Sequence, residues 1–111
     1  MPVQAARRIE ALVDDLGGRA EVARVLQVNR SQVTRWLDRG QEPDAGNLRK
    51  VEATELAMAR LLRLYDGPTA RLWLEGTNAH VGDRRPVDLL ARGRLAEVLA
   101  AIDAEEAQTF S

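Results

Sequence analysis

The stretch from Arg71 to Gly93 constrains the fold more than any other part of the chain. Apolar residues alternate in it with glycines and a proline, too densely for one long helix and too regularly for a disordered linker. Gly76 is expected to end a short helix, and Gly82 to supply a positive φ in the following loop. Pro86 suits the first turn of a second short helix, which Gly93 ends. From the residues alone, the stretch is a capped helix–loop–helix in a small core, and the side chain of Asn78 is expected to hold its turn.

The chain has 111 residues, enough for one small domain or for two parts that share a core. It has no Cys, which excludes disulfides, thiolate metal sites and a cysteine nucleophile, and which suits a cytoplasmic protein. No apolar run reaches the roughly 18 residues of a membrane span. The N-terminus also lacks the apolar stretch of a signal peptide. We therefore expect a cytoplasmic protein with no membrane partner.

The net charge is −1, but the charges are unevenly placed. Between Arg19 and Arg39 there are five arginines and two acidic residues. Between Ala96 and Ser111 there are four acidic residues and no basic one. A basic segment and an acidic tail in one short chain indicate two different partners.

Helical periodicity runs through the chain, and no segment alternates as a strand would. The predicted fold is therefore all-α, with a helix-turn-helix N-terminal half at residues 1–43 and a small helical C-terminal half at residues 44–111. Asn29, Asp44 and Thr69 are expected to cap helices. Besides the two short helices above, helices are expected at residues 2–16, 19–26, 30–38, 45–65 and 94–107. The 45–65 helix is expected to carry its apolar residues at Leu48, Val51, Leu56, Ala59, Leu62 and Leu64.

The segment from Arg19 to Arg39 has the layout of a helix-turn-helix. Ala23 provides the small residue that such a unit needs where its helices cross. The unit resembles the phage-repressor, or Xre-like, class, in which the position of Gln27 is frequently Gly. We therefore expect a strained or variant turn. The apolar residues that seal the corner are Val22, Leu26, Val28, Val33 and Trp36.

The second helix of this unit carries residue types that read DNA. If it enters the major groove, its first exposed side chains meet base edges, where Arg pairs with guanine and Gln with adenine. One copy reads little sequence, so a homodimer on an inverted repeat of double-stranded operator DNA is expected. The alternative is a helical hairpin with an arginine-rich, solvated face. The candidate base contacts are Arg30, Ser31, Gln32 and Arg35, and the candidate phosphate contacts are Asn29, Thr34 and Arg39.

The C-terminal half carries a second resemblance. Trp73-Leu74, Asn78, Val81-Gly82, Arg85-Pro86, Leu89-Leu90, Gly93, Val98 and Ile102 resemble the C-terminal toxin-binding domain of Xre-type antitoxins, the partners of RES-domain toxins. The resemblance covers about residues 44–105 and, with the helix-turn-helix, nearly the whole chain. Family members often carry Pro before the Asn, and here that position is Thr77.

The resemblance implies an antitoxin of a type II toxin–antitoxin system that neutralises a RES-domain toxin and represses its own operon. RES-domain toxins destroy NAD, and their antitoxins are thought to block the NAD-binding cleft with their C-terminal region. A toxin–antitoxin hetero-oligomer is therefore expected. The implied toxin-binding residues are Trp73, Leu74, Asn78, Arg85, Pro86, Leu89 and Leu90, with Glu105, Glu106, Phe110 and Ser111 in the tail.

Each of these two groups of residues has a structural alternative. Trp73 and Leu89 are then simply core residues. The tail is then a disordered stub, because acidic residues at a helix C-terminus oppose the helix dipole and favour fraying.

An enzyme is the class least supported by the sequence. The single His80 has no neighbouring His or Cys and is expected to be a loop residue rather than a metal ligand. There is no His-paired nucleophile, no Gly-rich phosphate loop and no convincing carboxylate pair. We expect no catalytic residue, no cofactor and no metal. The alternative functions are a stand-alone helix-turn-helix transcriptional regulator and a protein-binding adaptor with a degenerate helix-turn-helix.

Overall fold

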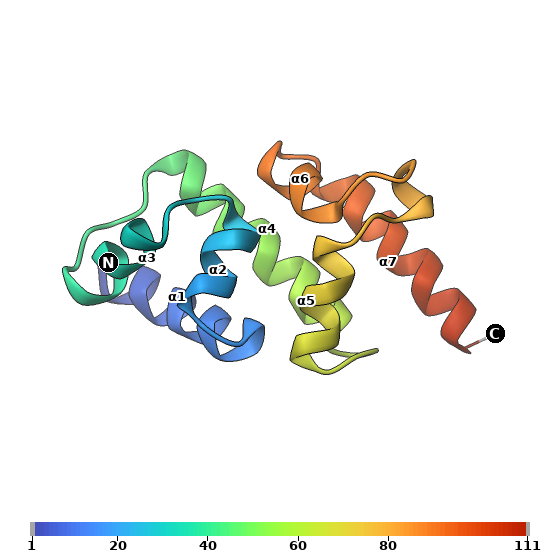
Figure 1. The fold of residues 1–111 in the computed structure, drawn as a ribbon, viewed down its shortest axis with the longest axis horizontal. Helices are drawn as coiled ribbons and strands as arrows, with labels where there is room; N and C mark the ends of the chain where they lie inside the picture. The colour runs from blue at the N-terminus through green and yellow to red at the C-terminus, as the bar shows by residue number, and fades with distance from the viewer. Residues whose placement is uncertain (1, 111) are drawn as a thin grey trace.

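The structure is a computed structural model that describes residues 2–110, and the side chains of residues 5–109 (Figure 1). No strand forms within these residues, where an isolated bridge joins Asn78 and Arg84. The all-α fold class is confirmed. The elements are α1 (Pro2–Leu16), α2 (Arg19–Leu26), α3 (Arg30–Asp38), α4 (Ala45–Leu61), α5 (Gly67–Glu75), the 3-10 helix η1 (Ala79–Val81), α6 (Pro86–Ala91) and α7 (Leu95–Phe110).

Short polar side chains begin several of these elements. Asp44 caps α4 by accepting a hydrogen bond from the backbone N–H of Asn47 at 2.8 Å, as predicted. The cap of α5 is Asp66, which accepts from the N–H of Thr69 at 2.9 Å. The predicted cap at Thr69 is therefore wrong, because the helix begins two residues earlier, at Gly67.

The end of α4 also differs from its prediction. The helix ends at Leu61 rather than at Tyr65. The N–H groups of Arg63 and Leu64 then bond to carbonyls three residues back, which tightens the chain into a turn. This turn leads directly into the Asp66 cap, so α5 starts soon after α4 ends.

Gly67 is needed where α5 begins, because the first turn of α5 meets the end of α1. A Cβ atom at Gly67 would lie 2.2 Å from the backbone oxygen of Asp15. Pro68 follows within the first turn of the helix, where its missing N–H costs no hydrogen bond. The sequence Asp66-Gly67-Pro68, predicted as a break, thus both separates two helices and starts the second one.

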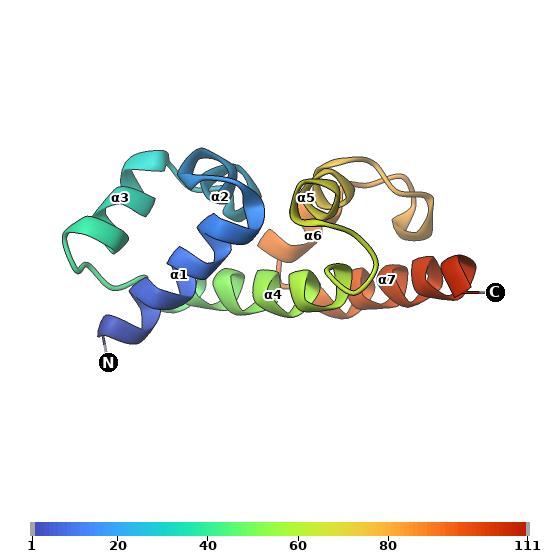
Figure 2. The same ribbon diagram turned by 90° about the horizontal axis from the view of Figure 1, so that it is seen from below.

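The helices form two layers (Figure 2). α4 and α7 lie side by side in one layer and run in the same direction, and α2, α5 and α6 lie above them. One core cluster includes residues from α1 to α3 as well as from α4 to α7. The boundary at residues 43 and 44 stays a prediction.

The apolar face of α4 is only partly as predicted. Val51 is buried, but Leu56, Ala59 and Leu62 are exposed. The side of α4 that faces the core consists of smaller residues together with Met58 and Leu61, because α2, α6 and α7 pack closely against that side. The buried residues on that side are Val51, Ala53, Thr54, Ala57, Met58 and Leu61.

Candidate functional site

Helices α2 and α3 form a compact corner. Ala23 is buried in α2, and Val33 and Trp36 of α3 are buried beneath the corner. Gln27 ends α2 with φ +57°, in the left-handed region that favours glycine. The turn is thus of a left-handed type, which agrees with the predicted strained or variant turn. The N–H of Val28 closes the turn by donating to the carbonyl oxygen of Ala23 at 3.0 Å.

The candidate DNA-contacting side chains lie on α3 and at its two ends. Asn29 occupies the predicted cap position, but its side chain accepts no capping hydrogen bond. The Nη2 atom of Arg35 donates to Oε1 of Gln32 at 3.1 Å. Within residues 5–109, no hydrogen-bond or ion-pair partner contacts the side chain of Arg30 or Arg39. Asn29, Arg30, Ser31 and Arg39 are exposed, and Gln32, Thr34 and Arg35 are half-buried.

An ion pair fixes the two helices of the corner to each other. Arg19, at the start of α2, donates two hydrogen bonds of 2.9 Å to the carboxylate of Asp38, at the end of α3. These hydrogen bonds lower the pKa of Asp38, because they favour its charged form. The orientation of α3 is therefore held at its C-terminal end, away from the residues predicted to read bases.

Four of the predicted toxin-binding residues are buried. Leu74, Pro86, Leu89 and Leu90 lie in the core, where α5 and α6 pack against each other and against neighbouring helices. Their side chains are thus not available at the surface of this chain. For Leu89 the structure agrees with the alternative that it is core.

Leu72 is an exposed leucine that was not among the predicted toxin-binding residues. Its exposed fraction is 61%, against 0% for Leu74. Helical periodicity contained the signal, because Ala70 and Leu74 lie one turn apart on the buried face and Leu72 lies opposite them.

Trp73 is half-buried and holds α5 to α7. Its Nε1 donates to Oε1 of Glu105 at 3.2 Å, and the hydroxyl of Tyr65 donates to Oε2 at 2.8 Å. The hydrogen bond to Glu105, followed by burial, raises the pKa of Tyr65. Both carboxylate oxygens of Glu105 therefore have partners inside the chain.

The acidic tail is helical rather than frayed in the described residues. α7 continues to Phe110, three residues past the predicted end. Oε1 of Glu106 lies 3.5 Å from Nη2 of Arg63, which adds a contact between the tail and the turn after α4. Ser111 and the side chain of Phe110 lie outside the described part of the chain.

The loop between α5 and α6 is held by its own polar groups. Oδ1 of Asn78 accepts from the N–H of His80 at 2.8 Å, and Gly82 has φ +69°, as predicted. Arg85 is exposed, and its Nε donates to the carbonyl oxygen of Glu75 at 2.7 Å. The backbone of the loop is therefore fixed at both ends.

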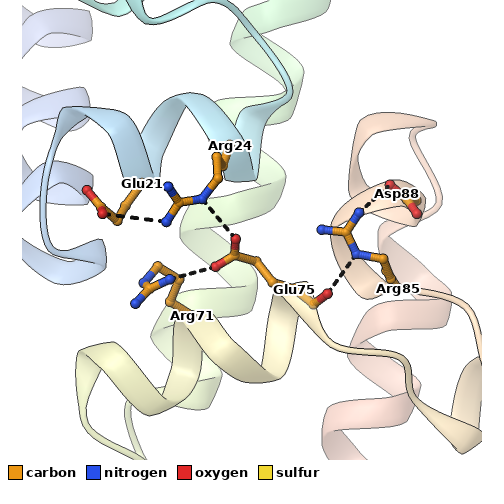
Figure 3. A network of polar contacts seen from close by, with 6 residues as sticks. All are labelled: Glu21, Arg24, Arg71, Glu75, Arg85 and Asp88. Atoms are coloured by element: carbon orange, nitrogen blue, oxygen red, sulfur yellow. Dashed lines mark hydrogen bonds and ion pairs between the residues drawn. The ribbon is translucent and has the colours of Figure 1, made fainter.

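A polar network connects the helix-turn-helix to this region (Figure 3). The carboxylate of Glu75 accepts from Nε of Arg24 at 3.2 Å and from Nη1 of Arg71 at 2.8 Å. Gln27, in the turn of the helix-turn-helix, donates from its side chain to Asp88 of α6. Arg71 and Glu75 lie one helical turn apart, but the Arg24–Glu75 and Gln27–Asp88 contacts join residues far apart in the chain, for which local sequence patterns carry no signal.

The fold matches a solved toxin–antitoxin structure. A chain of the structure described as the crystal structure of the M. tuberculosis MbcT-MbcA toxin-antitoxin complex superposes with a TM-score of 0.73 and 25% sequence identity. The match covers 89% of this chain and 90% of that one. It confirms the resemblance to antitoxin proteins. No family model and no curated protein matches the chain. None of the helices within residues 2–110 has both the length and the apolar character needed to cross a membrane.

Proposed function

We propose that this chain is the antitoxin of a toxin–antitoxin pair. It binds and neutralises a RES-like, NAD-degrading toxin by blocking the active site of that toxin, and it represses its own operon as a DNA-binding homodimer. The observation that carries the proposal is the fold match, over nearly the full length of both chains, with a chain of a toxin–antitoxin complex. In this role the protein acts by binding, without a catalytic residue or a cofactor.

The proposed toxin surface follows α5 and the loop after it. Its exposed members are Leu72 and Arg85, and its half-buried members are Trp73 and Asn78. A large exposed apolar side chain beside an aromatic one, bordered by polar groups, is typical of protein interfaces. The buried residues Leu74, Pro86, Leu89 and Leu90 support this surface from beneath.

The first test is co-expression of the chain with each adjacent open reading frame, followed by co-purification and assays of growth and cellular NAD. Rescue of growth by a co-purifying, NAD-depleting neighbour is the expected result. If no neighbour is toxic or binds, the antitoxin proposal is wrong.

Variants then locate the surface. Leu72→Asp should weaken binding of the purified toxin at least about tenfold, because it places a charge in the apolar contact. The matched control is Gln41→Asp, which places the same charge on an exposed residue of the loop before α4. Equal toxin binding by both variants and the wild type would place the interface elsewhere.

We further propose that the tail contacts the toxin cleft through Glu105, Glu106, Phe110 and Ser111, with its carboxylates facing basic groups. A truncation after Ala104 would also remove the acceptor of the Trp73 and Tyr65 hydrogen bonds, and so would disturb the fold. A truncation after Glu106 keeps these bonds. The shorter protein should remain folded and lose neutralisation, and unchanged neutralisation would remove the tail from the proposal.

DNA binding is proposed for Asn29, Arg30, Ser31, Gln32, Thr34, Arg35 and Arg39. The side chain of Arg30, exposed at the start of α3, supports it. Arg30→Ala should weaken binding to the upstream promoter fragment, and Arg39→Ala, at a candidate phosphate contact, should reduce the salt slope by about one. Arg92→Ala, at an exposed arginine after α6, is the control.

The second candidate is a stand-alone transcriptional regulator. The exposed arginines at the two ends of α3, Arg30 and Arg39, favour it, because they serve DNA binding whether or not a toxin exists. Salt-dependent promoter binding without any protein partner would select it.

A further inference from the structure

The side of α4 that faces away from the core carries a row of exposed residues. We call Glu52, Leu56, Ala59 and Arg63 the α4 stripe. They recur every three or four residues, so they lie along one face, with Arg63 in the turn that continues the helix. Leu56 is 53% exposed. In Figure 2 the α4–α7 layer lies on the opposite side of the molecule from α5, which carries the proposed toxin surface.

The α4 stripe is complementary to itself. Two copies of α4 can pair antiparallel about a two-fold axis that passes between positions 57 and 58. Residues that face each other across this axis then have numbers that add up to 115. Glu52 of one copy then faces Arg63 of the other at both ends, and Leu56 faces Ala59 at the centre. Opposite charges thus meet at each end, and each large apolar side chain meets a small one that allows close approach of the helices.

A groove beside the stripe offers space for the leucine of a second copy. It lies between α1 and α4 and has a volume of about 320 Å³. Ala59 belongs to both the stripe and the groove, so a Leu56 that faces Ala59 reaches the groove opening. Its apolar lining is formed by Ala11, Leu12, Met58, Ala59 and Leu62, and its polar lining by Arg8, Asp15 and Glu55.

The charged ends of the stripe keep their capacity for new partners. Glu52 lies 3.8 Å from Arg8, and Arg63 lies 3.5 Å from Glu106, with the Glu52 and Arg63 side chains 52% and 64% exposed. Ion pairs this long and this exposed hold their partners weakly. Both side chains can therefore pair across an interface.

A single stripe is narrow, since a specific interface buries about 800 Å² on each partner. α7 extends the surface beside α4 with a parallel row of small exposed residues at Ala96, Ala100 and Ala107. Small side chains add contact area without holding the two copies apart. α7 thus widens the surface that the α4 stripe offers to a second copy.

We infer that a second copy of this chain docks on α4, with the two α4 helices antiparallel and Glu52 of each copy paired with Arg63 of the other. The inference rests on the proposed function in one respect, since it supplies the surface for the homodimer that the proposed DNA binding requires. It is tested without toxin or DNA, so its failure is distinct from the failure of that function.

The first test measures the oligomeric state of the full chain by sedimentation equilibrium at micromolar concentrations. The wild type should be dimeric, and Leu56→Arg should be monomeric, because it brings like charges to the centre of the interface. Leu72→Arg makes the same change at an exposed leucine on α5 and should leave the dimer intact. A monomeric wild type, or a dimer that survives Leu56→Arg, would overturn the inference.

Charge reversal tests the register. Glu52→Arg alone and Arg63→Glu alone each place like charges opposite one another at both ends of the dimer, so each variant should dissociate more readily. An equimolar mixture of the two variants restores opposite charges at both ends and should form a mixed dimer. Circular dichroism checks that every variant is folded. If the mixture stays as dissociated as the separate variants, the antiparallel arrangement is wrong.

Discussion

The side chain of Gln27 donates a hydrogen bond to the carboxylate of Asp88, which lies 61 positions later in the chain. Gln27 is the left-handed residue in the turn between α2 and α3, and Asp88 belongs to the first turn of α6. A position that glycine would occupy without strain is therefore held by a residue whose side chain reaches the other half of the protein. Together with the Arg24–Glu75 ion pair, this contact fixes the helix-turn-helix against the α5–α6 region.

The backbone cost at Gln27 can be separated from its hydrogen bond. Gln27→Gly and Gln27→Ala both lose the contact with Asp88, but only Ala keeps a Cβ atom at φ +57°. We expect the Gly variant to be more stable than the Ala variant by about 1 kcal/mol. The free energies of unfolding in urea give this difference. Equal stability of the two variants would show that the left-handed turn has no such cost.

The sequence was sufficient wherever a local rule determines the structure. The bounds of α1, α2 and α3 agree with their predictions, because apolar periodicity, Gly17-Gly18 and the turn at Gln27 all mark them. Asn78, Gly82 and Pro86 also behave as predicted, since a side-chain hydrogen bond, a positive φ and a first helical turn each require particular residue types.

Burial was harder to predict, because it depends on which helices pack together. Leu56 and Leu62 have the spacing of core residues, yet they are exposed, since α4 turns another side toward α2 and α7. The resemblance implied that the apolar pair Leu89-Leu90 lies on a binding surface, but both residues lie in the core. The ion pair and hydrogen bonds between α2 and α5–α6 connect residues so distant in sequence that no local pattern indicates them.

Two leucines on α5 provide a direct test of this packing. Leu74→Ala should reduce the free energy of unfolding by about 2–5 kcal/mol, because it leaves a cavity in the core. Leu72→Ala should change it by less than about 0.5 kcal/mol, since Leu72 is 61% exposed. Chemical denaturation followed by circular dichroism measures both. Similar losses in the two variants would contradict the orientation of α5.

The cap of α5 predicts a dependence of stability on acid pH. Hydrogen bonds from the hydroxyl and the N–H of Thr69 lower the pKa of Asp66 below its ordinary value of 3.8. A carboxyl group whose pKa is lower in the folded state stabilises the fold fully above the unfolded pKa. That contribution is lost as the pH falls through the folded pKa.

We therefore compare the thermal stability of the wild type with that of Asp66→Asn, which can still cap the helix but does not titrate. The advantage of the wild type should be greatest near neutral pH and should disappear as the pH falls below about 3.8. Asp38, whose pKa is also lowered, is present in both proteins and does not affect the difference. An advantage that stays constant from neutral to acid pH would show that the charge of Asp66 does not contribute.

The contact between the start of α5 and the end of α1 gives the last prediction. Gly67→Ala places a Cβ atom 2.2 Å from the backbone oxygen of Asp15, and neither helix can yield without shifting the core. We expect a loss of about 1–3 kcal/mol in the free energy of unfolding. Gly46→Ala is the control, because Gly46 also lies in the first turn of a helix and its added Cβ would meet only Asp44 Oδ1, at 3.6 Å. That variant should be unchanged or more stable by up to about 1 kcal/mol. If Gly67→Ala were as stable as Gly46→Ala, the close approach of α5 to α1 would be wrong.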